Sequence, residues 1–86
     1  MGKYKVLIKP SAVKEIESLP TKKIRQQIVR RIQQLADNPR PPGYIKLTGL
    51  DRYRIRQGVY RIVYAVENDQ LIVYVVKVVH RKDIYR

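Results

Sequence analysis

The chain has no cysteine, no tryptophan and no phenylalanine, and it has a single histidine. Without cysteine it can form neither a disulfide nor a thiolate zinc site, and one histidine offers no ligand set for a metal. We therefore expect neither a metal nor a cofactor. All seven aromatic residues are tyrosines. Proteins that lie on membranes usually place Trp or Phe at the interface, so this composition also argues against a membrane partner.

Long apolar runs and targeting segments are missing as well. The longest apolar stretch, residues 71–79, is interrupted by Lys77 and is too short to cross a bilayer. Lys3, Lys5 and Lys9 interrupt the N-terminal residues, where a signal peptide would need a continuous apolar segment. We therefore expect a cytoplasmic protein. A length of 86 residues predicts one domain, residues 1–86.

Positive charge is the most distinctive property of the composition. The chain has 19 Lys and Arg against 7 Asp and Glu, a formal net charge of +12. The basic residues are spread over both halves of the sequence, so the excess does not belong to a tail. A folded cationic body of this kind favours a polyanionic partner, and nucleic acid fits better than a membrane.

The spacing of apolar residues predicts an α+β fold with the order β-α-α-β-β-β. Residues 4–8 form a short apolar strand, and Pro10 and Pro20 bracket a short helix. Thr21 suits the N-cap of a second helix with one apolar stripe and one basic face. The basic face is either simply solvated or a contact surface. After the proline-rich linker at residues 37–43, strands follow. We expect an antiparallel sheet with the helical hairpin on one face.

The stretch YIKLTGLDRYRIRQGVYRIVY, residues 44–64, carries the strongest functional pattern. Its arginines alternate with Tyr53 and Ile55, and this period of two predicts a strand with one cationic face. Gly58 ends that strand and Arg61 lies in the next. Guanidinium groups on a rigid strand face bind phosphodiesters well, because each is a planar fork of donors that keeps its charge. A solvated strand face is the simpler interpretation, but the interleaved tyrosines favour function. The arginines of the row are Arg52, Arg54 and Arg56.

The last strand, residues 70–79, is almost entirely apolar, which predicts a central strand that is covered on both faces. A two-residue turn at Asn68-Asp69 would pair residue 67 with residue 70. In that register Arg61 lies opposite Val76. His80 then shares a face with Arg61, and Lys77 lies on the other face.

A histidine near a strand end is more often structural than catalytic. His80 gains interest from its basic surroundings, because histidine is the side chain whose ordinary pKa lies near neutrality. An imidazole beside arginines and a phosphodiester would be a natural general base.

The element order and several motifs together resemble the RelE/ParE toxin superfamily, in particular its RelE-like mRNA interferase branch. The resemblance covers essentially the whole chain. The motifs that carry it are Lys46-Leu47-x-Gly49, Tyr53-Arg54-Ile55-Arg56, Gly58-x-Tyr60-Arg61-x-Val63-Tyr64 and His80-Arg81-x-x-x-Tyr85.

The resemblance implies a microbial-RNase-like fold and an endoribonuclease that needs no metal. Such toxins cut mRNA in the ribosomal A site by attack of the ribose 2′-OH. Arg61 and Arg81 match arginines that stabilise the scissile phosphate or protonate the leaving group, and Tyr85 matches a stacking tyrosine. Arginine stands where relatives commonly have lysine, which makes His80 the obvious base. The implied catalytic residues are Arg56, Arg61, His80, Arg81 and Tyr85, and the implied RNA- and ribosome-binding residues are Lys46, Arg52 and Arg54.

The resemblance also implies partners: an acidic antitoxin protein, the 70S ribosome and mRNA. It allows a heterotetrameric or larger toxin–antitoxin complex. Two other functions stay open at this point. One is a ParE-like inhibitor of DNA gyrase, and the other is a basic RNA- or ribosome-binding module without catalysis.

Overall fold

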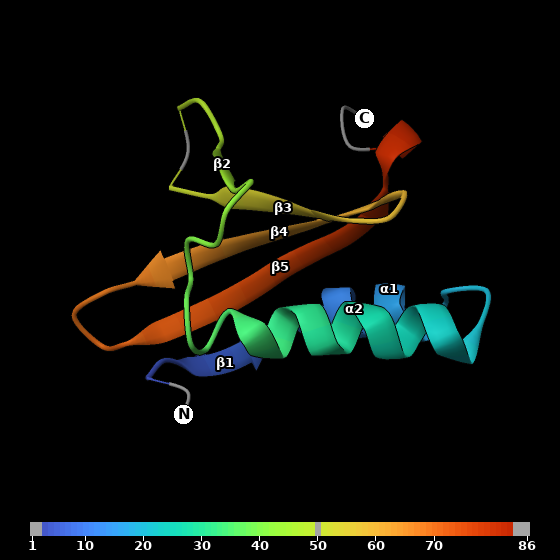
Figure 1. Cartoon of the computed structure of the whole chain (residues 1–86), viewed down its shortest axis with the longest axis horizontal. Coiled ribbons are helices and arrows are strands. Elements are labelled where there is room, and N and C mark those ends of the chain that lie inside the picture. Colours follow the sequence, from blue (N-terminus) through green and yellow to red (C-terminus); the bar gives the residue numbers. More distant parts are fainter. Residues whose placement is uncertain (1–2, 50, 84–86) are drawn as a thin grey trace.

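The computed structural model describes residues 3–49 and 51–83 and has the predicted α+β architecture, with two helices on one face of a five-stranded sheet (Figure 1). The strands lie in the order β1-β5-β4-β3-β2. β2 is an additional short strand that the predicted order β-α-α-β-β-β does not contain. The elements are β1 (Lys5–Ile8), α1 (Pro10–Glu17), α2 (Lys22–Gln34), β2 (Ile45–Lys46), β3 (Tyr53–Gln57), β4 (Tyr60–Glu67), β5 (Ile72–His80) and a final 3₁₀ turn, η1 (Arg81–Asp83).

The first strand departs from the expected antiparallel sheet. β1 pairs in parallel with β5, whereas the other three strand pairs are antiparallel. The connection between the two strands runs through residues 9–71 and includes both helices, which cross one face of the sheet. Beyond the end of β1, Glu15 of α1 accepts the backbone N–H of Val78 (3.0 Å). The helix thus takes over part of the edge of β5 that β1 is too short to cover.

Both helices begin where the sequence predicts. Pro10 is the first residue of α1, where its missing N–H costs nothing. The Thr21 hydroxyl caps α2 by accepting the N–H of Ile24 (3.1 Å). α2 presents Ile28 and Ile32, both fully buried, to the sheet. Neither helix of the described chain is long and apolar enough to cross a membrane.

The hydrophobic core lies between the helices and one face of the sheet. It is formed by Ala12, Ile16, Leu19, Ile28, Ile32, Leu35, Ile55, Ile62, Tyr64, Val73, Val75 and Val78. The expectation that the last strand is covered on both faces is wrong. β5 does lie inside the sheet, between β1 and β4, but Tyr74 is 37% exposed and Lys77 is also exposed. One face of β5 is therefore covered and the other is open.

The connection between β4 and β5 is longer than a two-residue turn. Glu67 pairs with Ile72, so residues 68–71 form the loop, and Leu71 adopts a positive φ of 55°. A second irregularity follows within the strands. Tyr64 pairs with Val75 and Val63 pairs with Lys77, which leaves Val76 as the extra residue of a β-bulge.

The bulge corrects the predicted register. A loop that is two residues longer preserves which side chains share a face, because the side-chain period of a strand is two. One extra residue within the strand reverses it. Arg61 therefore lies opposite Val79 and not Val76. Lys77 joins the face of Arg61, and His80, opposite Tyr60, joins the helix-covered face. Both placements are the reverse of those predicted.

The linker at residues 37–43 is fixed to the helix-covered face of the sheet, where it leads from α2 to β2 (Figure 1). The buried hydroxyl of Tyr64 donates to the carbonyl oxygen of Pro39 (2.6 Å), and burial raises the pKa of Tyr64 to about 12. Arg40 lies 5.1 Å from the centroid of the Tyr53 ring and donates to its hydroxyl (3.2 Å). That hydrogen bond raises the pKa of Arg40. The stiff linker is thus anchored at two adjacent residues.

Replacement of Tyr64 by Phe is expected to lower the free energy of unfolding by about 1 to 3 kcal/mol, because the buried carbonyl of Pro39 loses its donor. It should also change the pH dependence. A pKa raised from 10.0 to about 12 in the folded state stabilises the fold below pH 10, and that contribution is lost as the pH rises through 12. Urea denaturation of wild type and Tyr64→Phe across this range would measure both effects. Tyr74→Phe, at a partly exposed tyrosine, serves as the control. If wild type and Tyr64→Phe lost the same free energy of unfolding at alkaline pH, the assignment of this effect to Tyr64 would be wrong.

Candidate nucleic-acid interface

The β3–β4 hairpin gathers arginines on the face of the sheet that points away from the helices. Arg56 lies directly opposite Arg61 in the register, and Arg54 lies opposite Val63. Like charges directly opposite each other destabilise a sheet. The high density of positive charge on this face suits an anionic ligand.

The turn between β3 and β4 keeps these arginines opposed. Gln57 pairs with Tyr60, which leaves Gly58 and Val59 as a two-residue turn. Gly58 has a positive φ of 61°. A glycine with positive φ at the first central position is typical of a type II′ turn, whose twist matches that of the flanking strands. The carbonyl oxygens of Gly58 and Tyr60 also accept hydrogen bonds from Nη1 of Arg61, at 3.4 and 3.1 Å.

Lys77 completes this cationic surface, although the sequence predicts it on the opposite face. Because of the bulge, Lys77 lies opposite Val63, which in turn lies opposite Arg54. Val63 is only 6% exposed although both helices pack on the other face. We attribute its burial to the aliphatic stems of its long basic neighbours. We call the sheet surface that bears Arg54, Arg56, Arg61 and Lys77 the arginine face.

Arg81 lies next to the β3–β4 turn. Its backbone N–H donates to the carbonyl oxygen of Val59 (2.7 Å), which fixes the start of η1 against the hairpin. The side chain of Arg81 is exposed. Tyr85, the other predicted catalytic residue of this segment, lies outside the described residues. The structure therefore brings Arg56, Arg61 and Arg81 to one end of the β3–β4 hairpin.

His80 occupies a different environment from the one predicted. Its ring meets that of Tyr60 edge to face, with centroids 5.6 Å apart. Its Nδ1 accepts the backbone N–H of Lys82 (3.1 Å). That geometry requires an Nδ1 without a proton and holds the first turn after β5. His80 is thus placed to orient the segment that carries Arg81.

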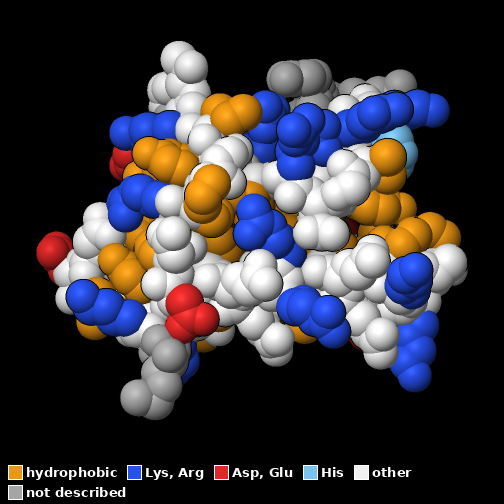
Figure 2. All heavy atoms as spheres, in the orientation of Figure 1, with side chains coloured by type: hydrophobic (Ala, Val, Ile, Leu, Met, Phe, Trp, Pro, Cys, Tyr) orange, Lys and Arg blue, Asp and Glu red, His pale blue; other side chains and the backbone are white. Residues whose placement is uncertain are grey.

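The predicted RNA-binding residues Lys46 and Arg52 lie at the outer border of the sheet. Lys46 is exposed on β2 opposite Tyr53. Arg52 precedes β3, and its carbonyl oxygen accepts the N–H of Leu47 (2.9 Å). Figure 2, which shows the helix-covered face, displays basic side chains along the border formed by β2, β3 and η1. The cationic surface thus continues around that edge.

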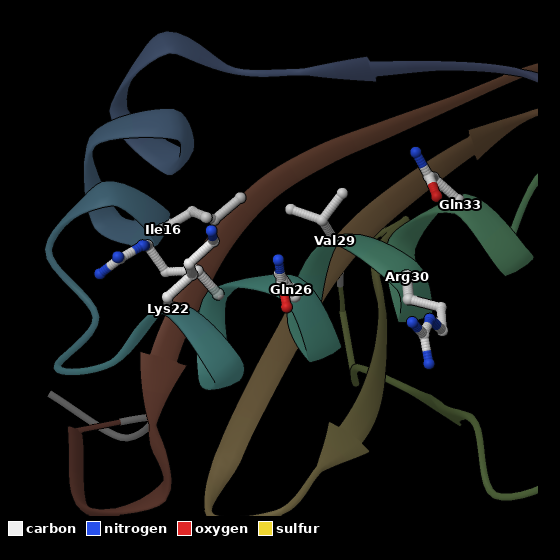
Figure 3. A pocket seen from close by; sticks show the side chains of 7 residues that line it. Ile16, Lys22, Gln26, Val29, Arg30 and Gln33 are labelled. Atoms are coloured by element: carbon white, nitrogen blue, oxygen red, sulfur yellow. The ribbon is translucent and has the colours of Figure 1, made fainter.

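A second surface feature lies between the two helices. A groove of about 520 Å³ is lined by Ile16 of α1 and by side chains along one side of α2 (Figure 3). Ile16 and Val29 supply apolar surface, and Lys22 and Arg30 supply positive charge. Arg25, also at this groove, donates to the carbonyl oxygen of Leu19 (2.9 Å) and so ties α2 to the connection between the helices.

Comparison with known proteins assigns the family. The sequence profile described as the ParE toxin of type II toxin–antitoxin systems, parDE, matches residues 6–85. The chain therefore belongs to this toxin family, and the predicted membership of the RelE/ParE superfamily is confirmed.

Individual relatives point to the RelE side of the superfamily. A RelE-like toxin protein of Escherichia coli is 39% identical over 88 residues, which cover 96% of this chain and 90% of the relative. Toxin RelE in the archaeal RelE–RelB complex of Pyrococcus horikoshii OT3 is 31% identical, with a TM-score of 0.83 over 94% of this chain and 98% of the other. A variant of Escherichia coli toxin RelE in the free state is 27% identical, with a TM-score of 0.79 over 99% of this chain and 90% of the other.

If Lys77 contributes to the arginine face, its removal should weaken binding of single-stranded RNA in a salt-dependent way. We expect Lys77→Ala to reduce the slope of log K against log salt by about 0.7, the value for one lost phosphate contact. Fluorescence anisotropy with a short labelled RNA would measure it. Lys14→Ala, which removes an equal charge from the exposed side of α1, should leave the slope unchanged. Equal changes in both variants would contradict the placement.

Proposed function

We propose that this toxin is an endoribonuclease that stops translation by cutting mRNA in the ribosomal A site. Membership of the toxin family supports a growth-inhibiting role. The observation that carries the enzymatic part is the cross-strand pair Arg56–Arg61 on an open, rigid sheet face, with Arg81 beside the same turn. Three guanidinium groups at one end of a hairpin fit the charge that develops on a phosphodiester under attack.

The reaction proposed for this surface is an internal transfer. The 2′ oxygen of the ribose attacks the adjacent phosphorus in line, the bond from phosphorus to the 5′ oxygen breaks, and a 2′,3′-cyclic phosphate and a free 5′-OH result. The 2′-OH loses its proton and the departing 5′ oxygen gains one. Arg61 and Arg81 stabilise the equatorial oxygens of the phosphorane, with Arg56 as a further cation. The chain supplies few groups beyond these, so the ribosome contributes much of the catalysis by positioning the codon.

His80 is better suited to position Arg81 than to act as the base. Its ring is on the face opposite Arg61 and packs on Tyr60, and its Nδ1 is engaged with the N–H of Lys82. Within this proposal the toxin acts in the cytoplasm, where ribosomes and mRNA are found.

The remaining predicted residues bind the substrate. Lys46, Arg52 and Arg54 contact the RNA or the ribosome, and Tyr85 stacks on the substrate.

Arg61→Ala and Arg81→Ala are each expected to lower the single-turnover rate of mRNA cleavage by about 10²- to 10³-fold, because each removes a fixed cation at the phosphorane. Programmed ribosomes with a labelled mRNA, read by primer extension, provide the measurement. Lys14→Ala serves as the charge-matched control. Each variant is first shown to be folded and bound to the ribosome. Cleavage at the wild-type rate by both arginine variants would refute the site.

His80→Ala separates the two roles of the imidazole. If His80 positions Arg81, the rate should fall about 10-fold, and the pH–rate profile should keep its shape. If the variant instead loses a limb near neutral pH, His80 is the base and the positioning role is wrong.

A second function is supported by the family description itself, which names the ParE toxin. The alternative for such a toxin, inhibition of DNA gyrase, needs no ribose 2′-OH and no cleavage. A toxin that leaves mRNA intact on programmed ribosomes but blocks supercoiling by gyrase would establish it. Salt-dependent binding without either activity would indicate a non-catalytic RNA- or ribosome-binding module.

We also propose an acidic antitoxin as the partner. Several structural neighbours are complexes of RelE with RelB, which is a statement about those proteins. For this chain the support is the net charge of +12 and the basic rim of the interhelical groove, which suits an acidic, partly apolar segment (Figure 3). A heterotetramer or a larger complex is consistent with such a pair.

The double substitution Lys22→Gln and Arg30→Gln is expected to weaken antitoxin binding by about 2- to 30-fold at low salt, since rim charges each contribute modestly. The difference from wild type should shrink as the salt concentration rises. Isothermal titration with a purified acidic antitoxin would measure it. Lys14→Gln with Lys23→Gln removes the same charge outside the groove. A loss as large in this control would show that only net charge matters.

A further inference from the structure

The arginine face ends in a hollow at the opposite end of β4 and β5 from the β3–β4 turn. Its volume is about 340 Å³. The residues that give it chemical character are Asp51, Arg52, Ala65, Glu67 and Tyr74. Ala65 lies opposite Tyr74 in the register, and the small alanine side chain leaves space beside the tyrosine ring. The hollow is therefore bounded by an aromatic ring that is 37% exposed.

Three residues that line the hollow, Ala65, Glu67 and Tyr74, lie on the same face of the sheet as the arginines. Ala65 follows Arg61 by four residues along β4, a distance of ~13 Å. It follows Val63, which separates Arg54 from Lys77, by two residues, or ~7 Å. The bulge at Val76 is what places Tyr74 on the same face as Lys77. An RNA strand whose phosphates lie on the arginine face can therefore place a neighbouring base at Tyr74.

The charges around the hollow suit a base better than a phosphate. Only 7 acidic residues occur in a chain of net charge +12, yet Asp51 and Glu67 both line this hollow. Carboxylates repel phosphates, but they accept hydrogen bonds from the amino groups of bases. One oxygen of Glu67 accepts the backbone N–H of Asp69 (3.3 Å), which orients the carboxylate. Arg52 supplies a cation for the adjoining phosphate or a base face.

We propose that this hollow is a nucleobase subsite, in which the base stacks on Tyr74 and an amino group of the base donates to Glu67 or Asp51. The proposal rests on the proposed RNA-cleaving function and adds a selection rule to it. Guanine presents two adjacent N–H donors, and cytosine and adenine each present one amino group. Uracil presents a single N–H between two carbonyl oxygens. These oxygens are acceptors, so the carboxylates of the hollow repel them. The subsite therefore disfavours uracil at one position near the cleaved bond.

The first test measures binding without the ribosome, so it does not depend on cleavage. The ¹H–¹⁵N and tyrosine-ring NMR signals of the toxin are followed during titration with the four ribonucleoside 5′-monophosphates. We expect shifts centred on Tyr74 and Glu67 for GMP, CMP and AMP, and at least about 3-fold weaker binding of UMP. Tyr74→Ala should abolish the shifts at the hollow, and Tyr74→Phe should preserve them because its ring still stacks. Shifts confined to the arginines, or equal binding of all four nucleotides, would overturn the proposal.

The second test uses cleavage. Messenger RNAs that vary each nucleotide around the cut site are compared with wild type, Tyr74→Ala and Glu67→Gln. At one position Tyr74→Ala should slow cleavage about 5- to 100-fold, from the loss of one stacked base, and the effect should be smallest for uracil. Glu67→Gln should reduce the discrimination against uracil there. Glu17→Gln, on the exposed side of α1, should behave as wild type. Unchanged base preference in both variants would overturn the subsite, whereas a wild-type toxin that never cuts would overturn only the proposed function.

Discussion

A single extra residue, Val76, determines which side chains of β5 lie on each face of the sheet. The β-bulge reverses the alternation of side chains halfway along β5. Val73 and Val75 before it and Val78 after it all point to the helices, so the core stays continuous across the irregularity. On the other face, the bulge aligns Tyr74 with Lys77. A regular strand with Val73 and Val75 in the core would have turned Lys77 inward and Val78 outward.

An open sheet face that concentrates cations needs a rigid base, because mutual repulsion favours any distortion that separates the charges. The covered face provides it. Tyr64 on β4 is fully buried and bonded to the linker at Pro39, and Glu15 holds the N–H of Val78 where β1 no longer reaches. Hydrophobic burial and these hydrogen bonds together hold β3, β4 and β5 in a fixed arrangement. The arginines therefore remain close together before any ligand binds, which reduces the ordering cost of binding an anion.

The sequence predicts the elements well because local signals define them: Pro10 and Thr21 at the helix starts, and the alternation of arginines in β3. It also predicts that Gly58 ends one arginine-bearing strand and that Arg61 lies in the next, and the structure pairs Arg56 with Arg61 across that turn. It fails at β5, where valines fill both faces and the pattern contains no period that would reveal a bulge. The position of Lys77 within that run was the available signal. A charged residue among valines indicates an open face, and it is consistent with the observed register and not with the predicted one.

The parallel pairing of β1 with β5 has a consequence for how the protein is made. Residues 5–8 find their partners at residues 72–75, near the other end of the chain. Contacts between such distant segments slow folding, because a long loop must close before they form. During synthesis β1 lacks its partner strand until almost the whole chain has emerged. The sheet of a nascent chain therefore stays incomplete until residues 72–75 have emerged.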